Sequence, residues 1–201
     1  HAYSEAADDG EGHTVRVCAD CGHSDVRNNE YTITYANMAD GEFGDNTPTV
    51  HTFGTETKLV APTRTGYSFG GWYYNGTKVT SLGATMYKSD ITLVARWNPL
   101  SYKITYKDYN NATLSGTLGK GTPPSHIYGF VTELVPAEKK GYSFAGWHTD
   151  KACTKLVTEI AADAYTAAFT LYAKWEVNSY DIEYYDMGGY DFSGEYGKNT
   201  P

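Results

Sequence analysis

The stretch Gly66-Tyr67-Ser68-Phe69-Gly70-Gly71-Trp72 is written twice in this chain of 201 residues. It returns as Gly141-Tyr142-Ser143-Phe144-Ala145-Gly146-Trp147, at an offset of 141 − 66 = 75 positions. Self-similarity at a fixed period indicates a repeat architecture, in which each repeat is one structural unit. The sequence therefore predicts a tandem array.

Two further phrases recur in the same order on either side of this stretch. The phrase Tyr31-Thr32-Ile33-Thr34-Tyr35 precedes it and returns at Tyr102–Tyr106 and Tyr180–Tyr184, and the phrase Thr92–Trp97 follows it and returns at Thr170–Trp175. The offsets differ slightly (102 − 31 = 71 and 170 − 92 = 78), which places small insertions in loops. We therefore divide the chain into a small N-terminal module (1–30), repeat 1 (31–101), repeat 2 (102–179) and the truncated start of repeat 3 (180–201).

Each repeat is predicted to be mainly β, or α+β with one short helix. Tyr31, Ile33 and Tyr35 alternate with threonines, which is the period of a half-buried strand. Between the central stretch and the closing strand we expect one short helix per repeat, over 157–165 in repeat 2 and more weakly over 78–88 in repeat 1.

The central stretch is expected to contain a β-bulge. Trp72 falls on the opposite parity from Tyr67 and Phe69, so that a regular strand would turn its indole away from theirs. An extra residue at Gly70-Gly71 would bring the indole back to the core face.

Composition and charge exclude several classes of function. The net charge is −8, seven of the acidic residues lie in 1–30, and no basic stripe is present, so nucleic acid is not an expected partner. No stretch has the apolar length of a membrane span, so no membrane insertion is expected within this fragment. A phosphate-binding glycine loop, a nucleophile elbow and an HExxH motif are all missing from the sequence, and we predict that the chain is not an enzyme.

The ordered phrases Tyr-x-Ile-x-Tyr, Leu-Val-x-Pro, Gly-Tyr-Ser-Phe-x-Gly-Trp and Thr-Leu-x-Ala-Arg/Lys-Trp resemble the Listeria–Bacteroides repeat family, to which the B-repeats of internalin B belong. The resemblance covers 31–175 and part of 180–201. It implies β-grasp-like (ubiquitin-like) modules in tandem on secreted or wall-anchored bacterial surface proteins. It also implies a role as stalk or adhesion module without an enzymatic site.

The N-terminal 30 residues hold a candidate metal site. Cys18 and Cys21 have the spacing of a zinc knuckle, with Gly22 allowing the tight turn. His1 and His13 would complete a Cys2His2 set for a structural zinc, although His13 needs a bend to reach it, and His23 is a reserve. The alternatives are a Cys18–Cys21 disulfide or two thiols. The segment is similar to a small His/Cys module found between repeats of large gut-bacterial surface proteins.

The aromatic residues and the remaining histidines are expected to be mostly structural. Tyr67, Phe69, Trp72 and Trp97 and their counterparts fit core packing better than a sugar-stacking platform. The less regular tyrosines are better candidates for exposure, and we predict Tyr73 and Tyr74 as ligand-binding residues. His51 and His126 occupy one shared structural slot, and Cys153 is expected to be a small buried or loop residue.

These observations predict the extracellular region of a bacterial surface protein, excised from a longer chain and acting as a stalk and adhesion spacer. The alternative is a module that binds a host glycan or surface protein through exposed aromatics. Self-association through strand edges is a third reading, although a monomer is expected.

Overall fold

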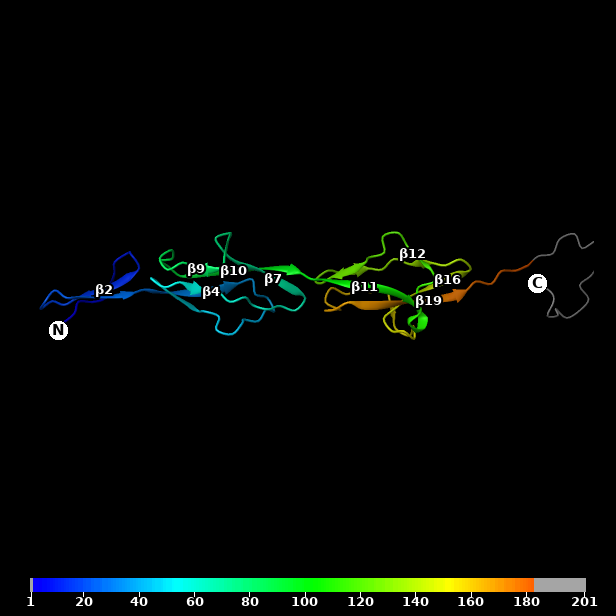
Figure 1. Ribbon diagram of the computed structural model, residues 1–201, viewed down its shortest axis with the longest axis horizontal. Helices are drawn as coiled ribbons and strands as arrows, with labels where there is room; N and C mark the ends of the chain where they lie inside the picture. Colours follow the sequence, from blue (N-terminus) through cyan, green and yellow to red (C-terminus); the bar gives the residue numbers. More distant parts are fainter. Residues whose placement is uncertain (1, 183–201) are drawn as a thin grey trace, which may run out of the picture.

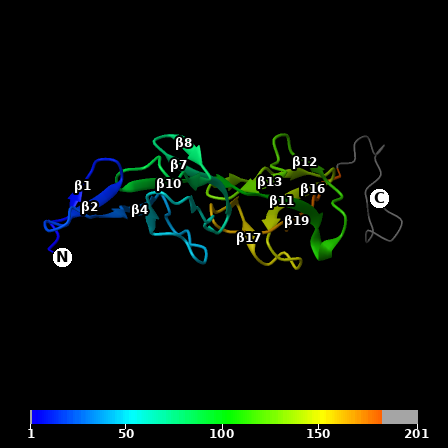
Figure 2. The ribbon, with the colours of Figure 1, turned by 60° about the vertical axis from the view of Figure 1, so that its left-hand side comes forward.

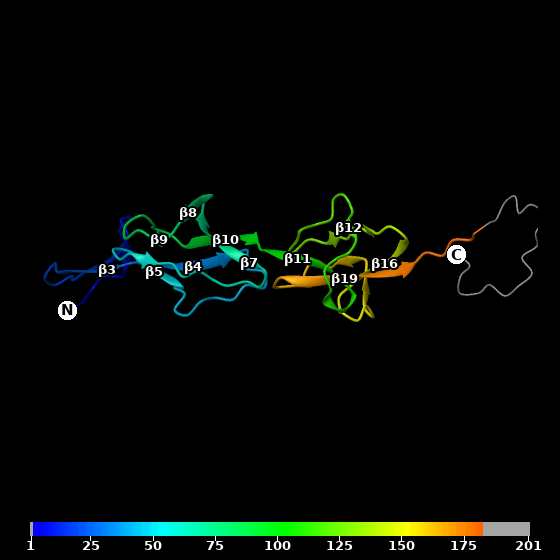
Figure 3. The same cartoon turned by 45° about the vertical axis from the view of Figure 1, so that its right-hand side comes forward.

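The computed structural model describes residues 2–182 and arranges them as three β modules that follow one another end to end. The N-terminal module lies at one end of the long axis, repeat 1 occupies the middle, and repeat 2 follows it (Figures 1 and 3). The modules do not fold back on each other in any of the views (Figure 2). The predicted start of repeat 3 (180–201) lies outside the described residues from position 183 onward, as does His1.

The N-terminal module is a three-stranded antiparallel sheet of β1 (Ala7–Asp8), β2 (His13–Val17) and β3 (Ser24–Asn28), with β2 in the centre. The turn between β2 and β3 is the segment 18–23, closed by a hydrogen bond from the Gly22 N–H to the Cys18 carbonyl (2.9 Å). An isolated bridge pairs Tyr3 with Cys18 and brings the start of the chain beside this turn.

Repeat 1 is built on a five-stranded mixed sheet with the order β5-β4-β10-β7-β8. The strands are β4 (Glu30–Ala36), β5 (Val50–Thr52), β7 (Tyr67–Tyr74), β8 (Thr77–Val79) and β10 (Ile91–Pro99). The first and last strands, β4 and β10, run parallel at the centre, while every other pairing is antiparallel. A small second sheet pairs β6 (Thr57–Lys58) with β9 (Ser81–Leu82).

Repeat 2 reproduces this arrangement with the order β13-β11-β19-β16-β17. Its strands are β11 (Ser101–Asp108), β13 (Ser125–Ile127), β16 (Tyr142–His148), β17 (Leu156–Val157) and β19 (Phe169–Val177). Two small sheets pair β12 (Thr117–Leu118) with β15 (Ala137–Glu138) and β14 (Thr132–Glu133) with β18 (Glu159–Ile160). A single 3-10 turn, η1 (Tyr109–Asn111), follows β11.

The expected bulge in the central stretch is present. In the β7–β10 pairing, Phe69 lies opposite Trp97 and Gly71 lies opposite Arg96, which leaves Gly70 as the extra residue. Gly71 has φ +130°, a conformation that L side chains rarely adopt, and this backbone reverses the parity of the strand. As a result Phe69 and Trp72 pack against each other on the same side, with ring centroids 5.2 Å apart.

Each repeat has its own small core around one tryptophan. Trp72 is 2 % exposed, and its indole N–H donates a hydrogen bond to the Val60 carbonyl at 2.8 Å. Trp147 is equally buried and donates to the Val135 carbonyl at the same distance. Leucine, isoleucine and alanine of the central strands fill the rest of the core: Ile33, Leu93 and Ala95 in repeat 1, and Ile104, Leu171 and Ala173 in repeat 2.

The mainly β expectation is confirmed, but the expected short helix in each repeat is wrong. The segment 157–165 forms the end of β17, the strand β18 and a following turn, and 78–88 forms β8, β9 and turns. An isolated helix of this length is marginal in water. Pairing with β14 buries Ile160 to 1 % exposure, so tertiary contact decides for the strand.

Candidate functional site

The two cysteines of the N-terminal module lie together in the β2–β3 turn. Cys18 is buried and Cys21 is exposed. The backbone N–H of Cys18 donates to the His23 carbonyl at 2.8 Å, which holds the turn closed. A side-chain hydrogen bond with Cys21 lowers the pKa of the Cys18 thiol, because it stabilises the thiolate.

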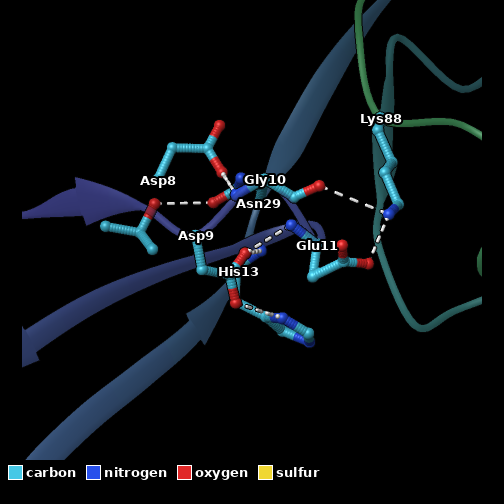
Figure 4. Close-up of polar contacts among 8 residues, drawn as sticks. Asp8, Asp9, Gly10, Glu11, His13, Asn29 and Lys88 are labelled. Carbon is cyan, nitrogen blue, oxygen red and sulfur yellow. Dashed lines mark hydrogen bonds and ion pairs between the residues drawn. The ribbon is translucent and has the colours of Figure 1, made fainter.

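The structure places His13 away from these thiols. His13 opens β2 while Cys18 follows the end of that strand, a separation of about 16 Å at roughly 3.3 Å per residue. The His13 Nδ1 lies 2.9 Å from a carboxylate oxygen of Asp9, and its ring packs edge-on against Phe53. Figure 4 shows this histidine in a polar cluster with Asp9, at the end of the module that faces repeat 1.

The predicted zinc set is therefore not assembled within the described part of the chain. No group of three or more His, Cys, Asp or Glu side chains there is placed to hold a metal ion. The expected CxxC knuckle is not borne out, since Cys18–Gly22 is a hairpin turn with two sulfur atoms and no further ligand among residues 2–182. The structural zinc stays a prediction that depends on His1.

The two tyrosines predicted to bind a ligand point to opposite sides of β7. The Arg96 guanidinium stacks 3.8 Å above the Tyr73 ring, a cation–π contact on the face away from the core. Tyr74 packs edge-on against the buried Tyr87 at 5.1 Å and belongs to the wall of the core. They do not form one platform, and repeat 2 has His148 and Thr149 in their places.

This geometry predicts unequal costs for the two tyrosines. Tyr73→Ala should lower the free energy of unfolding by about 0.5–1 kcal/mol, the usual worth of an exposed cation–π pair. Tyr74→Ala should cost more because it also opens a gap beside Tyr87. Urea unfolding of both variants would test this, and an equal cost would show that Tyr74 is not part of the core.

A shallow apolar hollow lies over the bulge of each repeat. The sequence did not predict it. In repeat 1 it has a volume of about 230 Å³ and is lined by Leu59, Phe69, Gly71, Trp72 and Val79. In repeat 2 it has about 370 Å³ and is lined by the matching residues Leu134, Phe144, Gly146, Trp147 and Val157. The repeated central phrase was the available signal, but only the bulge turns these side chains toward one hollow.

The shared histidine slot is structural, as expected. His51 and His126 are both fully buried, and each Nδ1 lies 2.8 Å from a threonine hydroxyl, Thr57 in repeat 1 and Thr132 in repeat 2. Each Nε2 is buried without a hydrogen-bond partner. Burial lowers the pKa of His51, because the charged imidazolium would be desolvated.

Cys153 is buried, as the sequence indicated. It is 5 % exposed and takes φ +50°. Burial first, and the nearby Asp150 carboxylate second, raise the pKa of its thiol. A raised pKa suppresses the thiolate and so disfavours a nucleophilic role.

Among residues 2–182, no helix has the length and apolar character needed to cross a membrane. No solved structure matches this chain. The chain is 34 % identical over 145 residues to a membrane protein of Evansella cellulosilytica, covering 69 % of this chain and 20 % of that protein. It is 29 % identical over 164 residues to a Gly-rich membrane protein of the same bacterium, covering 80 % and 18 %.

Internalin H of Listeria monocytogenes is 36 % identical over 96 residues, covering 46 % of this chain and 16 % of that protein. The chain thus spans about a fifth of the length of these relatives. The sequence profile of the Listeria-Bacteroides repeat domain matches residues 31–96 and 102–174, which are the two repeats described above. The chain belongs to the Listeria-Bacteroides repeat family.

Proposed function

We propose that this chain is a non-catalytic repeat region of a bacterial surface protein and acts as a stalk that holds other parts of that protein away from the cell. The observation that carries the proposal is the way in which one module continues into the next. Only Leu100 separates β10 from β11, and only Asn29 separates β3 from β4, so the backbone runs between modules in extended form without a loop. Short joins of this kind restrict hinge motion.

The location of the protein is part of the same proposal. The relatives named as membrane proteins and as an internalin support a bacterial surface or secreted location. The strand order of each repeat, with the first and last strands parallel in the centre, supports a β-grasp-like module that lacks the crossing helix.

Small-angle X-ray scattering of the chain at several concentrations tests the stalk proposal. A stalk should give an elongated monomer, with a maximum dimension that matches the end-to-end arrangement and an apparent mass that does not change with concentration. A compact particle would contradict it. An apparent mass that rises with concentration would instead show self-association through strand edges.

The second candidate is a module that binds a host glycan or surface protein, and the hollow repeated over the bulge of both repeats favours it. The test is binding to a panel of mucins, matrix proteins and glycans, with a salt titration to remove nonspecific signals. Lys78→Ala tests the hollow, because Lys78 is an exposed residue of its lining. Tyr73→Ala tests binding through the predicted tyrosine, whose ring lies outside both the core and the hollow, whereas loss of binding in Tyr74→Ala could reflect loss of folding. If no member of the panel binds, the binding function is contradicted and the stalk role is the one that remains.

A further inference from the structure

Specific hydrogen bonds and ring contacts connect repeat 1 to repeat 2, and we call this set of contacts a joint. The Leu100 N–H donates to the Gly66 carbonyl at 2.9 Å, and the Leu100 carbonyl accepts from the Tyr128 N–H at 2.9 Å. The Tyr128 ring covers Gly66 and meets the ring of Tyr67 edge-on, with centroids 5.5 Å apart. One residue between the two strands therefore bonds to both repeats at once.

The same joint connects the N-terminal module to repeat 1, although the two modules differ in fold. The Asn29 N–H donates to the Gly12 carbonyl at 2.9 Å, and the Asn29 carbonyl accepts from the Phe53 N–H at 2.9 Å. The Phe53 ring covers Gly12 and meets the ring of His13 edge-on at 5.3 Å. The two joints therefore have equivalent contacts. Gly12 corresponds to Gly66, His13 to Tyr67, Asn29 to Leu100 and Phe53 to Tyr128.

A side ion pair strengthens this first joint. The Lys88 ammonium of repeat 1 lies 2.7 Å from the Glu11 carboxylate and 3.3 Å from the Gly10 carbonyl (Figure 4). Exposed pairs of this kind contribute little to stability, so the glycine–aromatic contact remains the main element of the joint.

Glycine is required at the joint for two reasons. Gly12 and Gly66 have φ of +98° and +76°, which disfavours any side chain. A Cβ would also lie 2.5 Å from the Phe53 ring at Gly12 and 2.1 Å from the Tyr128 ring at Gly66. The aromatic ring sits where that side chain would be.

The far end of repeat 2 carries half of this joint. The Asn178 N–H donates to the Gly141 carbonyl at 3.0 Å, as Leu100 does to Gly66, and Gly141 has φ +80°. Apart from Gly141 and its two chain neighbours, no described residue has an atom within 4 Å of a Cβ built on Gly141, and Tyr142 is 36 % exposed. Lys139 stacks 4.0 Å over the Tyr142 ring, as Arg64 stacks 4.1 Å over Tyr67.

We propose that Gly141, Tyr142 and Asn178 form a docking surface for a further module of the same kind, which seats an aromatic ring on Gly141. The occupant is a repeat in the same chain, because the opening phrase returns at Tyr180, two residues after Asn178, just as Tyr102 comes two residues after Leu100. This inference concerns how modules dock and does not rest on the stalk role.

Residual dipolar couplings measured by NMR on the full chain test the existing joint. One alignment tensor should fit both repeats in the unmodified protein. Gly66→Ala and Tyr128→Ala should each separate the tensors of the two repeats. Gly141→Ala is the matched control, since it strains a backbone of nearly the same φ without meeting a ring, and it should leave the shared tensor unchanged.

The docking surface is tested by extending the chain, with residues 1–179 followed by a second copy of 102–179. The added repeat should share the alignment tensor of repeat 2, and Gly141→Ala should now separate the two. Independent tensors in the unmodified extended chain would overturn the docking surface. A shared tensor between repeats 1 and 2 that survives both Gly66→Ala and Tyr128→Ala would overturn the glycine–aromatic joint itself.

Discussion

Replacing Trp72 with alanine should lower the free energy of unfolding of repeat 1 by about 3–5 kcal/mol, the range observed when a large aromatic residue is removed from a core. The indole is 2 % exposed and packs between Phe69 and Tyr35, with ring centroids 5.2 and 4.7 Å away. The variant also removes the hydrogen bond that the Val60 carbonyl accepts from the indole N–H. Chemical denaturation followed by circular dichroism measures the change.

The second repeat supplies a matched experiment. Trp147→Ala should cost a similar amount, because Trp147 makes the same hydrogen bond and the same ring contacts with Phe144 and Tyr106. Val94→Thr is the control, since Val94 is 39 % exposed on the outer face of β10 and should change stability by no more than about 0.5 kcal/mol. A cost below about 1 kcal/mol for both tryptophans would show that these cores are not the source of stability.

Acidification from pH 7.5 to pH 5 should destabilise repeat 1 through His51. Burial lowers the pKa of His51 in the folded state, so between that value and the unfolded pKa of about 6.5 the unfolded chain binds more protons. The contribution of neutral His51 is complete above pH 6.5 and is lost as the pH falls through the folded pKa. The slope for one histidine is at most about 1.4 kcal/mol per pH unit.

Urea unfolding across this pH window measures the effect above the range in which the carboxylates titrate. His51→Gln is the control, because glutamine keeps an amide that can bond to the Thr57 hydroxyl but does not titrate. The variant should show a flatter dependence of stability on pH than the unmodified protein. An identical dependence in both would assign the acid sensitivity to other groups.

The sequence by itself determined the family and the mainly β character of each repeat. It also located the bulge, because the parity of Phe69 and Trp72 cannot place both rings on one face of a regular strand. The shared slot of His51 and His126 followed from its recurrence in both repeats, whereas its burial was found only in the structure. All of these features depend on local period and on internal repetition, which a single sequence displays directly.

Only the tertiary structure decided the features that depend on residues far apart in the chain. The segment 157–165 forms a strand and turns because β14 pairs with it and buries Ile160. His13 is separated from Cys18 because β2 is extended, and it packs on Phe53 of the next module. The joints bring Gly12 to Phe53 and Gly66 to Tyr128. These contacts form only when two modules have folded, so no local sequence pattern predicts them.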